Sequence, residues 1–205
     1  MLPPPAFFLA ALVLAITPGP GIAYVVARTA AGGRAEGLAS CVGTGLGGLV
    51  HVGAAALGLS LLLAQSAAAF TVVKYVGAAY LVYLGVRLLV SKSPPAPGKA
   101  RARGVAGAML EGILVEALNV KTALFFLAFL PQFLDGPGPA ALQLVAMGTT
   151  CVLLNTLVDV VAVLGAARLL GCELSARRRA RLLNKASGAT LVGLGLYVAA
   201  AKRSA

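Results

Sequence analysis

The sequence predicts an all-α integral membrane protein whose six transmembrane helices form two inverted three-helix repeats. Its 205 residues are 60% hydrophobic and only 11% charged, and the mean hydropathy is +0.94. A helix needs about 20 apolar residues to cross roughly 30 Å of hydrocarbon, and several uncharged stretches of this chain are that long. A soluble domain of this length would need far more polar surface to cover its core, so that class is excluded.

Charges, glycines and prolines divide the chain into six expected spans. Ala6 to Ala27 carries no charge, and between Gly37 and Val73 only His51 can become positively charged. The second stretch is too long for one span, so we expect it to turn back near Gln65 as a helical hairpin. The expected spans are residues 6–28, 38–63, 71–90, 106–133, 141–168 and 186–201.

Basic residues gather in alternate connections between these spans. The first, third and fifth connections hold thirteen of the 17 Lys and Arg residues, including the run Arg177–Arg181. The positive-inside bias makes this side cytoplasmic, so we expect both termini to face the periplasm or the exterior. The basic residues are not interleaved with aromatic residues on one face, so nucleic-acid binding is disfavoured.

The two halves of the chain carry related patterns. Residues 74–85 read Lys-x-x-Gly-Ala-x-x-Leu-Val-x-Leu-Gly, and residues 185–195 repeat this order with one residue fewer. We therefore expect a first repeat over 1–92, a cytoplasmic linker over 93–105 and a second repeat over 106–205. Because each repeat has three spans, the halves insert in opposite directions. That arrangement is typical of secondary transporters, whose substrate site lies near the midplane of the membrane.

The first expected span contains two prolines and two glycines close to its middle. In Thr17-Pro18-Gly19-Pro20-Gly21 each proline removes a backbone donor and the glycines loosen the helix further. We expect a discontinuous helix whose second half begins near Pro20, with its positive amino end facing the interior. Such an end suits a carboxylate. A plain proline kink is the alternative interpretation.

Several ionisable residues lie inside expected spans, where a charge is costly unless it has a partner or a function. Lys121 follows Asn119 in the fourth span, with Glu116 nearby, and Asp159 is the only charged residue between 140 and 167. Lys121 and Asp159 could instead form a structural ion pair. His51, the sole histidine, suits either a proton-transfer step or a hydrogen bond across a helix interface.

Cofactors and metals are not indicated by the sequence. Cys41, Cys151 and Cys172 share no Cys-x-x-Cys spacing, so neither a disulfide framework nor a zinc site is expected. Glycines 43, 45, 47 and 48 favour close helix packing rather than a nucleotide-binding loop.

Four segments together resemble the LysE/RhtB family of amino-acid exporters. They are Thr17-Pro-Gly-Pro, Lys74-Tyr-x-Gly-Ala-Ala-Tyr-Leu-x-Tyr-Leu-Gly85, Asn119-x-Lys121 followed by Phe125-Phe126, and Leu130-Pro-Gln-Phe133. The matching segments extend from Thr17 to Gly195. The resemblance implies a bacterial inner-membrane exporter of amino acids or close derivatives, driven by the proton gradient rather than ATP. It also implies an acidic residue in the fifth span, which corresponds to Asp159.

Three positions depart from the pattern of that family. Val120 stands where the family usually has the proline of Asn-Pro-Lys, so we expect a less sharply broken fourth helix. Gly21 stands where the family often has Asn, and it lacks a side-chain amide that could contact substrate. Glu116 occupies a place that is usually polar and uncharged.

The resulting hypothesis is a secondary exporter, not an enzyme, that alternates access around a midplane site. We expect substrate binding by Thr17, Pro18, Gly19, Pro20, Gly21, Asn119 and Lys121, and proton coupling by Asp159, His51 and Glu116. Its partners are the amino-acid substrate, protons and membrane lipids, and a homodimer is one assembly open to it.

Two other functions remain open at this stage. One is a transmembrane thiol or electron shuttle through Cys41 and Cys151, which lie in corresponding spans of the two repeats. This function is disfavoured because apolar burial works against reactive thiolates. The other is a divalent-cation exporter that uses Glu116 and Asp159. It ranks lower because hard cations need several oxygen ligands and the nearby Lys121 would repel them.

Overall fold

The computed structural model describes residues 3–59, 67–90, 102–134 and 138–169, together with residues 185, 188, 189, 191–193, 195, 196, 199 and 200. All regular structure in these ranges is helical, as predicted. The elements are α1 (Pro5–Ile16), α2 (Pro20–Ala54), a π-helical turn η1 (Ala55–Leu59), α4 (Ala67–Val90), α5 (Gly104–Ala117), α6 (Val120–Ala128), a 3-10 turn η2 (Leu130–Phe133) and α7 (Ala140–Leu169). Most of the expected linker, the turn near Gln65 and much of the sixth span lie outside the described residues.

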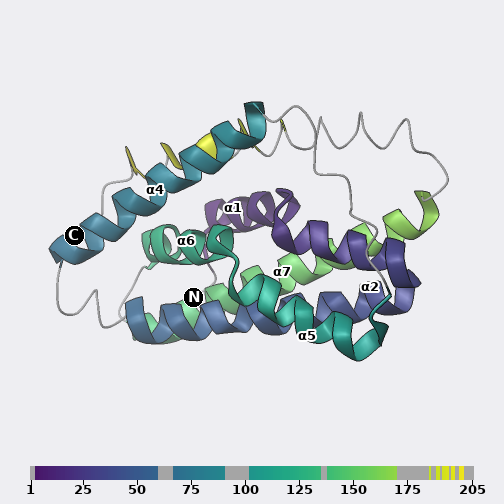
Figure 1. Ribbon diagram of the computed structural model, residues 1–205. Helices are drawn as coiled ribbons and strands as arrows, with labels where there is room; N and C mark the ends of the chain where they lie inside the picture. Colours follow the sequence, from purple (N-terminus) through teal and green to yellow (C-terminus); the bar gives the residue numbers. More distant parts are fainter. Residues whose placement is uncertain are drawn as a thin grey trace.

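Helix α2 contains a reversal at Gly33. This residue has φ 75° and ψ −169°, a backbone conformation that is essentially restricted to glycine. Figure 1 shows the chain doubling back at this bend, so that the parts of α2 before and after Gly33 run side by side. The second half of the expected first span and the expected second span as far as Ala54 therefore belong to α2, and η1 continues the second span to Leu59.

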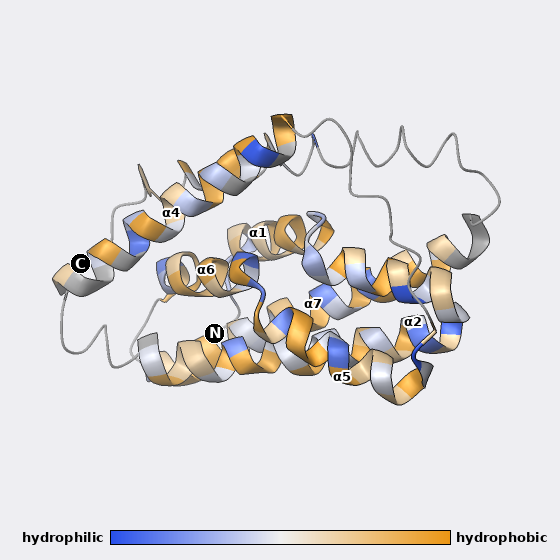
Figure 2. Ribbon diagram, viewed as in Figure 1, coloured by the Kyte–Doolittle hydropathy of each residue, from blue (hydrophilic) through white to orange (hydrophobic). Residues whose placement is uncertain are grey.

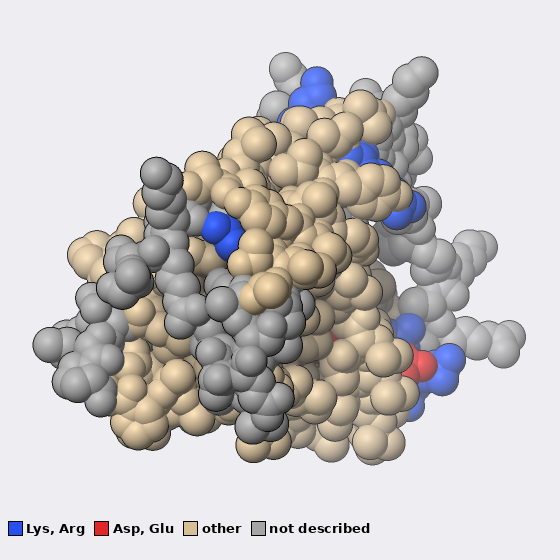
Figure 3. Space-filling view, turned by 90° about the vertical axis from the view of Figure 1, so that its left-hand side faces the viewer, with Lys and Arg blue, Asp and Glu red and all other residues tan. Residues whose placement is uncertain are grey.

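Polar and apolar residues are distributed as a lipid environment requires. Leu57, Leu118 and Leu153 are 73%, 77% and 65% exposed, whereas Glu116 and Asp159 are each 1% exposed. Figure 3 shows that residues other than Lys, Arg, Asp and Glu cover most of the described surface on one face. Exposing large aliphatic side chains while burying carboxylates is unfavourable in water and favourable in a bilayer.

Helix length gives the same indication. Within the part of the chain that the structure describes, Pro20–Gly58 and Ala140–Ala166 are long and apolar enough to cross a membrane. A third candidate arises if α5 and Val120–Phe133, which are bent by 45°, count as one span.

Helix α2 packs against α5 and α7 through glycines. A Cβ on Gly43 would fall on the carbonyl oxygen of Met109, and one on Gly112 would lie 2.8 Å from the carbonyl oxygen of Ser40. On the other side, a Cβ on Gly48 would lie 2.9 Å from Val152. The expected role of Gly43 and Gly48 in close packing is confirmed, since backbone or side-chain atoms of neighbouring helices occupy the space that a side chain would fill.

Helix α4 meets the described residues of the last segment at two further glycine contacts. A Cβ on Gly85 would lie 2.6 Å from the carbonyl oxygen of Gly188, and one on Gly195 would lie 2.7 Å from that of Ala78. In the repeated pattern Gly85 corresponds to Gly195, and Ala78 follows the glycine that corresponds to Gly188. Exchanging the two halves would therefore convert the Gly85–Gly188 contact into one between Gly195 and the residue next to Ala78, which is nearly the second contact.

Candidate functional site

The first helix is broken at the predicted place. Helix α1 ends at Ile16, and α2 begins at Pro20 after an extended Gly19 with φ −143° and ψ −172°. Thr17 closes the end of α1, because its hydroxyl donates to the carbonyl oxygen of Val13 at 2.6 Å. Prolines at 18 and 20 cannot donate backbone hydrogen bonds, so the helix stops and restarts within three residues.

A second break lies between α5 and α6, although Val120 replaces the expected proline. Asn119 takes an extended conformation and its side-chain oxygen accepts a hydrogen bond from the Lys121 backbone amide at 3.1 Å. This cap satisfies a free donor at the start of α6. The fourth expected span is therefore broken by asparagine capping, and the bend of 45° needs no proline.

Lys121 reaches from the second break into the first. Its ammonium donates to the carbonyl oxygen of Thr17 at 2.9 Å and to that of Leu14 at 3.3 Å. These carbonyls form the carboxyl end of α1, the negative end of its dipole. A Cβ on Gly19 would lie 2.9 Å from the ammonium, so a glycine is needed there for this close approach.

Glu116, at the end of α5, lies beside the other end of the first break, where α2 begins. Its carboxylate accepts hydrogen bonds from Asn119 Nδ2 at 3.0 Å and Thr122 Oγ1 at 2.6 Å. A Cβ on Gly21 would lie 2.8 Å from Glu116 Oε2. The residues of the second break thus place a cation at the carboxyl end of α1 and an anion beside the amino end of α2.

Asp159 and His51 complete the buried polar group. Thr44 Oγ1 donates to Asp159 Oδ2 at 2.9 Å, while Asp159 Oδ1 has no hydrogen-bond partner in the described ranges. His51 Nε2 lies 2.8 Å from the carbonyl oxygen of Glu116. Because a carbonyl can only accept, this nitrogen carries the proton, and the bond joins α2 to the end of α5.

The ionisable residues expected inside the spans are therefore gathered in one region. The structural ion pair between Lys121 and Asp159, which was the alternative interpretation, is not formed in the part of the chain that the structure describes. Lys121 and Asp159 form no salt bridge among the described residues. Glu116 contacts both breaks, a relationship that sequence reasoning missed. The glycine at position 21 was the available signal, because it leaves space for a neighbouring side chain.

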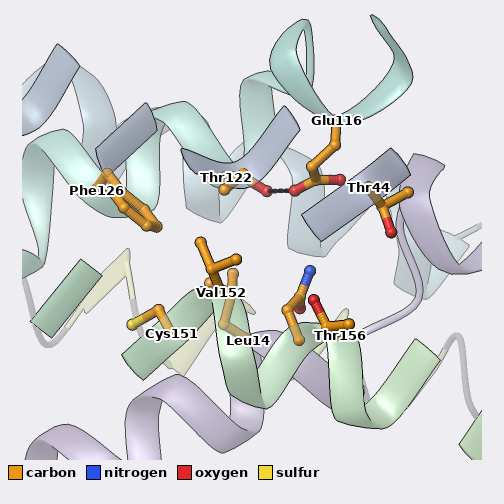
Figure 4. Close-up of a pocket in the computed structure, with 10 residues that line it drawn as sticks. Leu14, Thr44, Glu116, Thr122, Phe126, Cys151, Val152 and Thr156 are labelled. Carbon is orange, nitrogen blue, oxygen red and sulfur yellow. Dashed lines mark hydrogen bonds between the residues drawn. The ribbon is translucent and has the colours of Figure 1, made fainter. Parts of the chain in front are cut away.

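A small cavity lies between these helices. Its polar lining comes from Thr44, Glu116, Thr122, Asn155 and Thr156, and Leu14, Phe126 and Val152 supply apolar walls. Figure 4 shows Thr122 and Glu116 on one side of the cavity, with Val152 and Thr156 of α7 opposite. The cavity offers about 10 Å³ to the centre of a water molecule, which is room for about one water. In this structure the cavity is therefore too small to hold an amino acid.

Asn155 and Thr156 were not among the residues expected from sequence. Asn155 precedes Asp159 by four residues on α7, so the two lie on the same side of that helix. This spacing of polar residues within an apolar span could have identified Asn155 beforehand.

A second charged cluster ties the bend of α2 to the start of α5. Glu36 Oε1 accepts from the backbone amides of Arg103 and Gly104 at 3.0 and 2.8 Å. Arg28 Nη1 lies 3.9 Å from Glu36 and 4.0 Å from Glu111. Glu111 is thus engaged here and not with Lys121, and Figure 2 shows hydrophilic residues at this end of both helices.

Comparison with known proteins identifies the family. The LysE type translocator profile matches residues 12–202. The chain belongs to this family. The fold and the buried polar group described above are thus those of a membrane transporter of the LysE family, and the resemblance noted in the sequence is confirmed.

Named relatives of this LysE-family chain include amino-acid efflux proteins. A homoserine/homoserine lactone efflux protein of Salmonella typhimurium is 28% identical over 97% of each chain. A leucine efflux protein of Salmonella choleraesuis is 29% identical over 65% of this chain and 64% of its own. A membrane protein of Pseudomonas aeruginosa is 34% identical over 97% of this chain and 95% of its own. No solved structure matches the chain.

The geometry lends no support to the thiol or cation alternatives for this LysE-family protein. Cys41 packs with Val25 and Val163, whereas Cys151 belongs to the larger apolar cluster, and both thiols are free and buried. Cys172 lies outside the described residues. Over the ranges that the structure covers, no group of three or more His, Cys, Asp or Glu side chains is placed to hold a metal.

Proposed function

We propose that this protein is a secondary active exporter of amino acids or related small zwitterionic metabolites. It works in the bacterial inner membrane and uses the proton gradient. The observation that carries the proposal is the interlocking of two helix breaks, in which Lys121 and Glu116 face the two ends of the first break. Efflux proteins for leucine and for homoserine and its lactone among the relatives support an amino-acid substrate.

Six spans in two inverted repeats provide the framework of this proposal. Each half begins with a broken helix, and the Gly85–Gly188 and Ala78–Gly195 contacts nearly exchange when the halves are exchanged. Symmetry of this kind lets a transporter open alternately to either side around a fixed midplane site. The excess of basic residues in alternate connections supports a cytoplasmic linker and outward-facing termini.

The cavity is the centre about which access alternates. On opening, the carboxyl group of the substrate, free or as a neutral derivative, contacts the amino end of α2, around Gly19 to Gly21, and Lys121. The substrate ammonium contacts Asp159, whose Oδ1 has no hydrogen-bond partner within the described ranges. Asn119 and Thr17 keep the two breaks in place.

Proton coupling in this mechanism is assigned first to Asp159. Loss of the substrate ammonium leaves a buried carboxylate that is stabilised by taking up a proton, which links substrate release to proton binding. His51 and the Glu116 carboxylate are the further candidates for the proton path. His51 Nε2 lies 2.8 Å from the backbone carbonyl oxygen of Glu116, which keeps the imidazole beside that residue.

Uptake of labelled amino acids into everted membrane vesicles tests this function. A strain that expresses the protein is first screened for protection against toxic concentrations of individual amino acids, which identifies the substrate. Vesicles from that strain are then expected to accumulate the substrate, and a protonophore is expected to abolish the accumulation. Accumulation equal to that of vesicles without the protein, for every compound in the screen, would rule out the proposed export.

A further inference from the structure

Gly21 and Glu116 are sterically matched. A Cβ at position 21 would lie 2.8 Å from Glu116 Oε2, so any larger residue there would displace the carboxylate. Glu116 is 1% exposed and is fixed on its other side by Asn119 and Thr122. Both neighbours are placed to donate hydrogen bonds to its carboxylate.

The charge that faces the cavity is therefore negative. Glu116 lines the cavity, whereas Lys121 and Asp159 do not. The Lys121 ammonium is engaged by the carbonyls of Leu14 and Thr17 at the end of α1. One oxygen of Asp159 accepts a hydrogen bond from Thr44, which does line the cavity. Asn155, Thr156 and Thr44 contribute only neutral polar groups.

A free carboxylate on a substrate meets two obstacles at this position. The positive amino end of α2 already has the Glu116 carboxylate beside it, so the incoming group competes for the same place. Two like charges at close range in a poorly solvated site also repel each other strongly. An amide, ester or lactone carbonyl can accept the same hydrogen bonds without a net charge.

We propose that Glu116, seated against Gly21, is a specificity-determining residue that favours amino compounds with a neutral carboxyl group over the corresponding free amino acids. The inference rests on the proposed export function. It concerns the ranking of substrates within that function, which the charge of one buried side chain sets.

Matched pairs of compounds provide the test. Homoserine with homoserine lactone, and leucine with leucinamide, differ mainly in the charge of the carboxyl group. Initial uptake into everted vesicles is measured for both members, with vesicles that lack the protein as the correction for passive diffusion. The wild-type protein is expected to prefer the neutral member of a pair by about tenfold, the size of one charge interaction in a partly screened site.

Glu116→Gln keeps the size of the side chain and removes its charge. The Thr122 hydroxyl can rotate to accept from the new amide, so the packing against Gly21 is retained. The preference is expected to fall to about twofold or less, chiefly through faster transport of the free acid. Glu111→Gln removes another carboxylate from α5 at a distance from the cavity, and it is expected to leave the preference unchanged.

The outcomes separate the two proposals. Wild-type transport of free acids at rates equal to or above those of their neutral derivatives overturns the role of Glu116 and leaves export intact. An unchanged preference in a folded Glu116→Gln variant overturns it as well. Transport of no compound in either pair, together with no protection in the growth screen, overturns the export function and the inference with it. The wild-type comparison needs no variant, so the test holds even if Glu116→Gln fails to fold.

Discussion

The ammonium of Lys121 lies 2.9 Å from the carbonyl oxygen of Thr17, although 104 residues separate them in the chain. A side chain that begins at the second helix break thereby closes the carboxyl end of the first. Glu116 approaches the other end of the same break beside Gly21. Because both breaks are stabilised by the same short segment, a displacement of residues 116–121 would change both ends of the first break together.

Replacing Lys121 by Met is expected to destabilise the protein and to stop export. The change leaves the buried carbonyl oxygen of Thr17 without its Lys121 donor, at a cost of about 1–3 kcal/mol. The carbonyl oxygen of Leu14 also loses Lys121 but keeps the Thr17 backbone amide at 3.3 Å. Thermal unfolding in detergent measures the first effect, and vesicle uptake for each folded molecule measures the second. A variant that is less stable yet exports at the wild-type rate for each folded molecule would restrict Lys121 to a structural role.

Asp159→Asn is expected to separate substrate binding from proton coupling. The amide keeps an oxygen that can accept the Thr44 hydroxyl, so the fold should be retained. It cannot take up and release a proton, so accumulation driven by the proton gradient should fall by more than about tenfold. Exchange of labelled for unlabelled substrate at equal concentrations needs no net proton movement, so we expect it to continue at saturating substrate, although the neutral amide binds the substrate ammonium more weakly. Gradient-driven accumulation at the wild-type rate would remove Asp159 from the proton path.

Local chemistry made part of this site predictable. Two prolines in five residues indicated the break between Ile16 and Pro20, and single charges in apolar stretches identified Lys121 and Asp159. The break before Val120 was expected to be less sharp than one made by proline, and the capping of the following helix by Asn119 was not foreseen.

The partners within the site could not be predicted from sequence, since they depend on how separate helices pack. No local pattern states that Lys121 reaches Thr17 or that Glu116 fills the space beside Gly21. A connection between the first two spans was expected over residues 29–37, and the reversal at Gly33 lies within it. That helix continues on both sides of a single glycine could not be predicted, since the positive φ of Gly33 is not evident from the sequence. The all-helical class was predictable because it depends only on the length and hydrophobicity of the stretches.

Gly43→Ala is expected to destabilise the contact between α2 and α5. The new methyl group would fall on the carbonyl oxygen of Met109, so the helices must separate, at a cost of about 1–3 kcal/mol. Gly53 lies on the same helix, and a Cβ there meets nothing within 4 Å. Gly53→Ala is therefore expected to be neutral or to stabilise the helix by up to about 1 kcal/mol. Unfolding temperatures of the two variants in one detergent give the comparison, and equal shifts would contradict close packing at Gly43.

Val120→Pro is expected to be tolerated, even though it places a proline inside an apolar stretch. Val120 is the first residue of α6, where proline lacks a donor that the helix does not use and its fixed φ suits the turn. The preceding Asn119 has φ −75° and ψ 99°, within the extended region that a residue before proline prefers. Val120 is 50% exposed, so little packing is lost.

The variant should therefore unfold at a temperature equal to or above that of the wild type, with a gain of about 0.4–1 kcal/mol from the restricted unfolded chain. Leu124→Pro, one turn further into α6, serves as the control. There the ring would remove a hydrogen bond of the helix interior and cost about 3 kcal/mol or more. If Val120→Pro were as destabilising as Leu124→Pro, α6 would have to begin earlier than Val120, and the break that positions Lys121 and Glu116 would not lie at Asn119.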